Sequence, residues 1–163
     1  MNTISKLGLI SLSVLALSAP VSANQLLKNN TFSDNTSNWW GAGGDLKSAS
    51  SAGCLTYGNA GSNLWDVILG QGGFGLIKGE TYSISFDIKA NTNTKGVVLV
   101  QHDGAPYNQY FNKAIKINTR FENHQYSFKY SSKNDPKATF QFQLGADKPA
   151  TVCIDNVSLT IGD

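Results

Sequence analysis

The feature that most constrains the fold is a strict alternation of apolar and polar residues. It runs through Glu80–Ala90 and again through Thr139–Gly145. Successive side chains of a β-strand point to opposite faces, so this period of two predicts strands with one face in a core. The residues predicted to face that core are Tyr82, Ile84, Phe86 and Ile88 in the first stretch and Phe140, Phe142 and Leu144 in the second.

Further strand-like stretches are separated by short runs of Gly, Asn, Asp and Ser, which are typical turn residues. Many short strands at this spacing predict an all-β protein, a two-sheet β-sandwich and most simply a jelly roll. We interpret Gly41–Gly44 and Gly72–Gly75 as flexible turns. The other predicted strands are Cys54–Gly58, Trp65–Leu69, Val97–Gln101, Gln109–Asn118, His124–Ser132 and Thr151–Ile161.

The first 23 residues have the pattern of a secretory signal. Lys6 precedes an apolar run at Leu7–Leu17, and Val21-Ser22-Ala23 supplies the small residues of a cleavage site. The apolar run is too short to span a membrane. We therefore expect a secreted protein, extracellular or periplasmic, whose folded module is Asn24–Asp163 and has no membrane attachment after cleavage. A retained N-terminal anchor is the alternative.

The charge of the chain argues against two classes of partner. The formal net charge is only +2, and Arg120 is the single arginine. Proteins that bind nucleic acid or anionic membranes concentrate Lys and Arg on one surface, and no such cluster occurs here. We expect neither partner, and we expect a monomer.

Cys54 and Cys153 are the only two cysteines. In an exported protein two cysteines usually pair. The bridge would close a loop of about 100 residues, which the chain-entropy model values at up to ~4.7 kcal/mol. The spacing excludes a CxxC redox site and makes a poor zinc site. We predict a structural disulfide between an early strand and the last one.

The polar face of Thr139–Gly145 carries two amides, Gln141 and Gln143. Each amide offers two hydrogen-bond donors and an acceptor on one flat group, which matches the paired hydroxyls of a sugar. A solvated outer face without a ligand explains the same pattern. This strand by itself leaves both interpretations open.

Several motifs together resemble the family-4/9 carbohydrate-binding modules, and family 4 in particular. They are Asn29–Asp34 followed by Trp39, Trp65-Asp66-Val67, Gly79–Phe86, Gly104-Ala105-Pro106-Tyr107, Phe142–Gly145 and Cys153–Leu159. The resemblance covers essentially the whole chain after Ala23. It implies a galactose-binding-domain-like jelly roll that holds one β-glucan-type chain in an open cleft. The implied ligands are cello-oligosaccharide or amorphous cellulose, β-1,3-glucan or xylan. Family members usually accompany glycoside hydrolases, and we expect this module to be non-catalytic.

The resemblance also implies roles for individual residues. Tyr107 matches a tyrosine that stacks on a sugar ring, although it could instead plug the turn after Pro106. Asp103 stands where an asparagine is usual, and Ala42 where a second stacking tyrosine is usual. Trp40 or Trp65 could take the stacking role of that second tyrosine. Each of them could instead lie in the core, where we expect Trp39 to lie. The implied carbohydrate-binding residues are Tyr107, Gln143, Gln141, Asp103, Gln71, Trp40 and Trp65.

The family further suggests one structural Ca²⁺ where the first and last strands meet. By position its ligands would be Asp155, through carboxylate and carbonyl, and the carbonyls of Thr31 and Ser51. Such hard oxygen donors suit Ca²⁺. Alternatively, Asp155 caps a strand turn.

Two other functions remain open at this stage. A small jelly-roll glycoside hydrolase would need two carboxylates facing each other across a cleft. The available acids are Asp66, Asp87, Asp135, Glu80 and Glu122, none in a recognisable catalytic motif. An adhesion or protein-interaction sandwich is the third possibility. We interpret His102 and His124 as structural.

Overall fold

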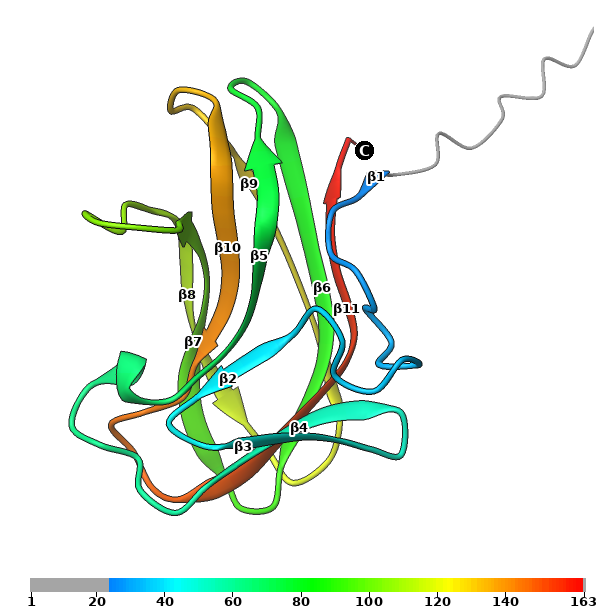
Figure 1. The fold of residues 1–163 in the computed structure, drawn as a ribbon, viewed down its shortest axis with the longest axis vertical. Coiled ribbons are helices and arrows are strands. Elements are labelled where there is room, and N and C mark those ends of the chain that lie inside the picture. The colour runs from blue at the N-terminus through cyan, green and yellow to red at the C-terminus, as the bar shows by residue number, and fades with distance from the viewer. Residues whose placement is uncertain (1–23, 163) are drawn as a thin grey trace, which may run out of the picture.

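The computed structural model describes residues 24–162, which form two antiparallel sheets packed face to face (Figure 1). The signal predicted at Met1–Ala23 lies outside the described residues. Sheet A consists of β3 (Asp45–Ala49), β4 (Ala52–Tyr57), β11 (Ala150–Ile161), β6 (Thr81–Ala90) and β9 (Glu122–Lys129), with β1 (Asn24–Gln25) beside β11. Sheet B consists of β2 (Trp40–Ala42), β5 (Ile68–Leu76), β10 (Asp135–Gln143), β7 (Thr94–His102) and β8 (Gln109–Ile117). The predicted two-sheet sandwich is confirmed.

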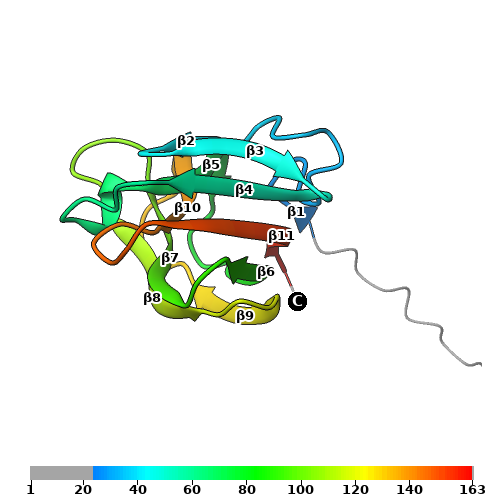
Figure 2. The ribbon, with the colours of Figure 1, turned by 90° about the horizontal axis from the view of Figure 1, so that it is seen from below.

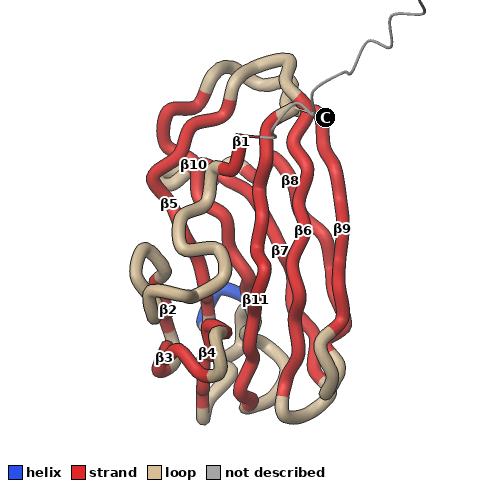
Figure 3. Tube along the Cα trace, turned by 90° about the vertical axis from the view of Figure 1, so that its right-hand side faces the viewer, coloured by secondary structure: helices blue, strands red, loops and turns tan. Residues whose placement is uncertain are grey.

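The layers are clearest from below, where Figure 2 shows β3, β4, β11, β6 and β9 in that order. Figure 3 shows that strands make up most of the trace and that one short helical turn interrupts them. This turn is η1 (Leu64–Asp66). Within residues 24–162, no helix has the length and apolar character needed to cross a membrane.

The alternating stretches pack against each other as the pattern predicts. In β6 Tyr82, Ile84, Phe86 and Ile88 are at most 1% exposed, and in β10 Phe140 and Phe142 are fully buried. The ring of Phe86 from sheet A meets the ring of Phe142 from sheet B edge to face, with centroids 4.9 Å apart. Edge-to-face pairs are a favourable aromatic geometry. This contact joins the two sheets at the centre of the core.

The residues before β2 close one side of the sandwich. Phe32 and Trp39 are buried and their ring centroids lie 5.2 Å apart. The Trp39 indole N–H donates to the carbonyl oxygen of Asn29 at 3.1 Å. A buried indole needs such a partner. The prediction that Trp39 lies in the core is confirmed.

The predicted disulfide is confirmed. Cys54 of β4 and Cys153 of β11 lie directly opposite each other and are bonded. Leu55, the neighbour of Cys54, is fully buried in the core, so the alternation of the strand places the bridge on the outward face of sheet A.

Three local predictions are wrong. Gly41 and Ala42, predicted as part of a flexible turn, belong to strand β2 and pair with β5. Gly72–Gly75 is part of β5 rather than a flexible turn, because β10 supplies hydrogen-bond partners along its length. Gly73 has φ +84° and is the extra residue of a bulge, a conformation that glycine adopts without strain. Trp65 lies in η1, before the strand that was predicted to include it. Strand β3 was not predicted.

Candidate functional site: a glutamine-floored cleft

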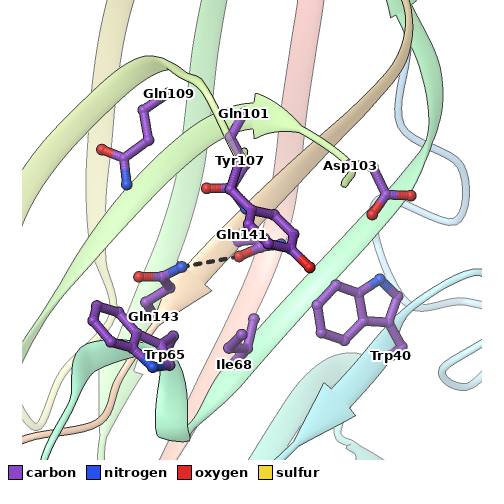
Figure 4. A pocket seen from close by; sticks show the side chains of 9 residues that line it. All are labelled: Trp40, Trp65, Ile68, Gln101, Asp103, Tyr107, Gln109, Gln141 and Gln143. Carbon is purple, nitrogen blue, oxygen red and sulfur yellow. Dashed lines mark hydrogen bonds between the residues drawn. The ribbon is translucent and has the colours of Figure 1, made fainter. Parts of the chain in front are cut away.

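A cleft of about 620 Å³ lies on the outward face of sheet B. Figure 4 shows its side chains converging from loops and strands that are far apart in the sequence. The lining residues are Trp40, Trp65, Ile68, Gln101, Asp103, Tyr107, Gln109, Gln141 and Gln143. Eight of these nine side chains carry no charge, so the cleft is built from neutral amides and aromatic rings.

The floor consists of three glutamines on the two central strands. Gln141 and Gln143 come from β10, and Gln101 comes from β7, opposite Thr139 on the same face. They are only 5%, 6% and 6% exposed, respectively. Polar groups are seldom held this far from bulk water without partners.

Most of the hydrogen-bonding capacity of this floor is unused within the protein. Gln143 Nε2 donates to Gln141 Oε1 at 3.1 Å, as Figure 4 marks. Within residues 24–162 the side chain of Gln101 has no hydrogen-bond partner. None of the unpaired amide atoms is sealed from solvent, however, because the only sealed and unpaired side-chain polar atom in that range is His124 Nε2. The free donors and acceptors therefore open into the cleft.

Three aromatic side chains stand around this floor. Trp40, Trp65 and Tyr107 are 38%, 61% and 58% exposed. In the described part of the chain only two other large hydrophobic side chains, Ile77 and Phe121, are exposed. A cluster of exposed rings around one hollow is typical of a binding surface, because exposing them to water carries a free-energy cost.

Trp40 reaches the cleft because β5 has a glycine beneath it. Trp40 pairs with Gly70 in the β2–β5 ladder, so both point to the cleft side. A Cβ atom at position 70 would lie 2.8 Å from Cζ2 of the Trp40 ring, inside van der Waals contact. Glycine at this position therefore lets the indole lie close against the sheet.

Trp65 is held by a loop that is fastened to the end of β10. The N–H of Leu144 donates to the Val67 carbonyl at 2.8 Å, and the N–H of Gly145 donates to the Leu64 carbonyl at 2.9 Å. Asp66 Oδ2 accepts from the N–H groups of Ser62 and Asn63. These hydrogen bonds, with that of Asn63 first, lower the pKa of the Asp66 carboxyl. These bonds hold the backbone that carries Trp65, whose side chain lines the cleft together with Gln143.

Tyr107 lies in the loop between β7 and β8, and a buried carboxylate fastens the base of this loop. Asp135, the first residue of β10, accepts hydrogen bonds from His102 Nδ1 at 3.0 Å and from the Tyr110 hydroxyl at 2.8 Å. Its Oδ1 also accepts from the Lys137 N–H. Asp135 therefore ties the end of β7 and the start of β8 to β10.

The pKa values of this cluster follow from its burial and hydrogen bonds. Burial would raise the pKa of Asp135, but the hydrogen bonds from Lys137, His102 and Tyr110 outweigh it and lower the pKa. The pKa of Tyr110 is raised, first by burial and then by its bond to Asp135. The cluster holds an ionised carboxylate, and His102 is structural here as the sequence indicated.

The structure gathers six of the seven predicted carbohydrate-binding residues around one cleft. The exception is Gln71, which pairs with Phe140 and shares its inward face. Its amide donates to the Lys28 carbonyl at 2.9 Å and accepts from the Lys28 N–H at 2.6 Å. Gln71 therefore fastens the chain before β2 and lies outside the cleft.

Three lining residues were not predicted: Gln101, Gln109 and Ile68. Gln101 ends a nearly all-apolar stretch, and that single amide was the available signal. Gln109 and Ile68 carry no distinguishing sequence signal, because their place in the cleft depends on which strands become neighbours.

The carboxylates proposed for a hydrolase do not line this cleft. The only acid among the lining residues is Asp103. Asp66 holds η1 and Asp135 anchors the Tyr107 loop. A glycosidase of the usual kind needs two carboxylates on either side of the scissile bond.

Comparison with known proteins agrees with this geometry. A family model described as "Carbohydrate binding domain" (CBM_4_9) matches residues 24–151. The chain belongs to this family. It is a carbohydrate-binding module of the family-4 type, a class that is not catalytic in itself.

The relatives of this module include endoglucanase C from Cellulomonas fimi, which is 27% identical over 156 residues. The match covers 89% of this chain but 14% of the enzyme, so the module corresponds to a small part of that protein. The second N-terminal cellulose-binding domain of the same glucanase has 25% identity and a TM-score of 0.72, with 87% and 97% of the two chains covered. A structure described as "CBM4 structure and function" has 21% identity and a TM-score of 0.77, with coverage of 83% and 99%.

The oxygen donors expected for Ca²⁺ come from adjoining segments of the module. Ile154 pairs with Gly53, close to Ser51, and the Val157 N–H donates to the carbonyl of Asn30, next to Thr31. The pKa of Asp155 is raised, first by burial and also by the nearby Asp87. A half-buried carboxylate and backbone carbonyl oxygens are donor types that suit a hard cation. Within residues 24–162 no group of three or more His, Cys, Asp and Glu side chains could hold a metal, and calcium stays a prediction.

Proposed function

We propose that this module binds a single β-glucan-type chain in the glutamine-floored cleft and does not cleave it. The observation that carries the proposal is the combination of three exposed aromatic rings with a floor of underused amides. Amorphous cellulose and its oligosaccharides are the first candidates, because relatives are described as cellulose-binding domains. β-1,3-Glucan and xylan are the next.

The two kinds of side chain match the two surfaces of a sugar ring. A pyranose presents C–H groups on its faces, and a flat aromatic side chain gives those faces contact area at low cost in rotamer entropy. Its hydroxyls lie around the edge, where amides can both donate and accept. Trp40, Trp65 and Tyr107 would stack on sugar faces while Gln101, Gln141 and Gln143 bond hydroxyl groups.

We expect modest affinity for each sugar unit. A hydrogen bond to a sugar hydroxyl replaces one to water, so its net contribution is only about 0.5–1.5 kcal/mol. Ordering a flexible polysaccharide chain costs further free energy. Long chains should therefore bind better than short oligosaccharides.

The test is affinity electrophoresis in gels that contain hydroxyethyl cellulose, laminarin or xylan, followed by calorimetry with the retained polymer. Tyr107→Ala should weaken binding about two- to tenfold, since an aromatic stacking contact is worth about 0.5–1.5 kcal/mol. Phe121→Ala is the matched control, because Phe121 is 44% exposed but lies outside the cleft. Equal losses in both variants, or no retention by any of the polymers, would contradict the proposal.

The non-catalytic part of the proposal has its own assay. No reducing sugar should be released from the same polymers, because the cleft lining holds one carboxylate where hydrolysis needs two. Release that depends on Asp103 would favour a hydrolase. We further infer that the protein is exported, since the Cys54–Cys153 bridge is typical of oxidising compartments.

A further inference from the structure

The cleft holds a single carboxylate, Asp103, and within residues 24–162 its side chain makes no hydrogen bond or ion pair that would hold its loop. Asp103 is the first residue after β7. Its backbone N–H donates to the Lys137 carbonyl at 2.9 Å, which fixes the position of the residue. Its side chain takes part in neither of the two ion pairs found within residues 24–162 and in none of their side-chain hydrogen bonds.

The carboxylate lines the cleft on the side where Trp40 lies. Figure 4 shows Asp103 on the same side of the cleft as Trp40, away from Trp65. Both flanking aromatics on that side, Trp40 and Tyr107, are exposed platforms. A sugar stacked there would bring its ring substituents close to the Asp103 oxygens.

No positive charge in the cleft offsets this carboxylate. The other eight lining side chains are neutral, and within residues 24–162 no Lys or Arg lies within ion-pair distance of Asp103. Asp103 is exposed, so salt in the solvent screens its charge. The cleft lining therefore carries one net negative charge, although the whole chain has a formal net charge of +2.

Resting on the proposed function, we propose that Asp103 is a specificity residue that makes the cleft select glycans by charge. Uncharged chains, and chains with amino or ammonium groups, are accepted. Chains with carboxylates, such as uronic acids or acidic substituents, are disfavoured at the subsite beside Trp40. The amides provide affinity for a polysaccharide, whereas Asp103 discriminates between neutral, cationic and anionic polysaccharides.

The experiment compares three derivatives of one backbone at matched degrees of substitution: neutral hydroxyethyl cellulose, anionic carboxymethyl cellulose and cationic quaternary-ammonium cellulose. Calorimetry at pH 7 and about 10 mM ionic strength, where the Debye length is about 30 Å, maximises the charge effect. If the protein retains only laminarin, the same three substituents are placed on β-1,3-glucan. The expected order of affinity is cationic, then neutral, then anionic.

Two like charges 4–7 Å apart in water repel enough to change an equilibrium constant about three- to fivefold. We therefore expect the anionic polymer to bind about three- to fivefold more weakly than the neutral one. This ratio of neutral to anionic affinity should approach one at about 1 M salt, because salt screens the charges. Asp103→Asn should bring the ratio close to one at low salt while preserving side-chain shape. The ratio, rather than the neutral affinity, is the readout, because Asp103 also touches the ligand.

Asp34→Asn is the matched control. It removes the same unit of charge from an exposed loop position outside the cleft and should leave the ratio unchanged. If the anionic and cationic polymers bind equally weakly, substituent size is responsible and the inference is wrong. It is also wrong if the parent binds neutral and anionic polymers equally, or if Asp34→Asn abolishes the discrimination as Asp103→Asn does. Failure of the neutral polymers to bind would overturn the proposed function and this inference together.

Discussion

The outward faces of the two sheets both carry polar side chains, but these side chains differ in how far they are exposed to water. On sheet B, the glutamine amides are nearly buried beneath exposed rings. On sheet A, a shallower hollow of about 410 Å³ has a polar lining of Ser83, Ser85, Gln125, Ser127 and Ser158. No large hydrophobic side chain at this hollow is exposed in the described residues.

The difference shows that polarity alone does not produce a cleft like that of sheet B. Gln125 on sheet A has the same amide as Gln143 on sheet B, but it is exposed and competes with bulk water. Its Nε2 also donates to Asn123 at 2.9 Å. The amides of sheet B lie in a cleft whose walls limit water and supply stacking area. The walls, more than the amides, distinguish the two faces.

The largest expected effect separates the structural role of sheet A from the binding role of sheet B. Replacing Cys54 and Cys153 together by Ser should reduce the free energy of unfolding by about 2–5 kcal/mol, because a loop spanning 99 residues is no longer closed. Polysaccharide affinity at a temperature where the variant is folded should not change, since the bridge lies on the other face. Chemical denaturation and calorimetry measure the two quantities. A large loss of affinity in the folded variant would show that the two faces are coupled.

An intermediate effect is expected when the amides of Gln143 on sheet B and Gln125 on sheet A are removed in turn and compared. Gln143→Ala should weaken polysaccharide binding about tenfold, from the lost hydrogen bonds and the disturbed Gln141 contact. Gln125→Ala, the matched change on sheet A, should change affinity by less than about twofold, within the usual range for a surface substitution. Affinity electrophoresis of both variants checks the pair. Similar losses would mean that sheet A also contacts the ligand.

The smallest expected effect concerns pH and the anchor of the Tyr107 loop. Because the folded protein holds the pKa of Asp135 below its ordinary value of 3.8, the carboxylate stabilises the fold above that pH. This contribution is lost as the pH falls through the lower, folded-state pKa. The melting temperature of Asp135→Asn should therefore lie below that of the parent at pH 7, and the gap should narrow as the pH falls below 3.8. A gap that does not depend on pH would mean that the charge of Asp135 contributes nothing.

Much of the fold could be predicted because alternation reports directly which face of a strand is buried. The inward residues of β6 and β10 are those that the period of two indicated. The pattern failed at β5, where glycines hide the strand signal. Gly70 has no side chain to show which way it faces, and only the sheet reveals that it accommodates Trp40.

The sequence by itself determined the β-sandwich, the disulfide and most of the residues of the cleft, since alternation, cysteine number and family motifs are local or short-range signals. The tertiary structure decided which amides share a floor. Gln101 joined Gln141 and Gln143, while Gln71 turned inward to bond Lys28. It also decided that Trp40 and Trp65 are walls rather than core. The physical reason is that strand neighbours and register, which are set by long-range pairing, determine which side chains meet on one face.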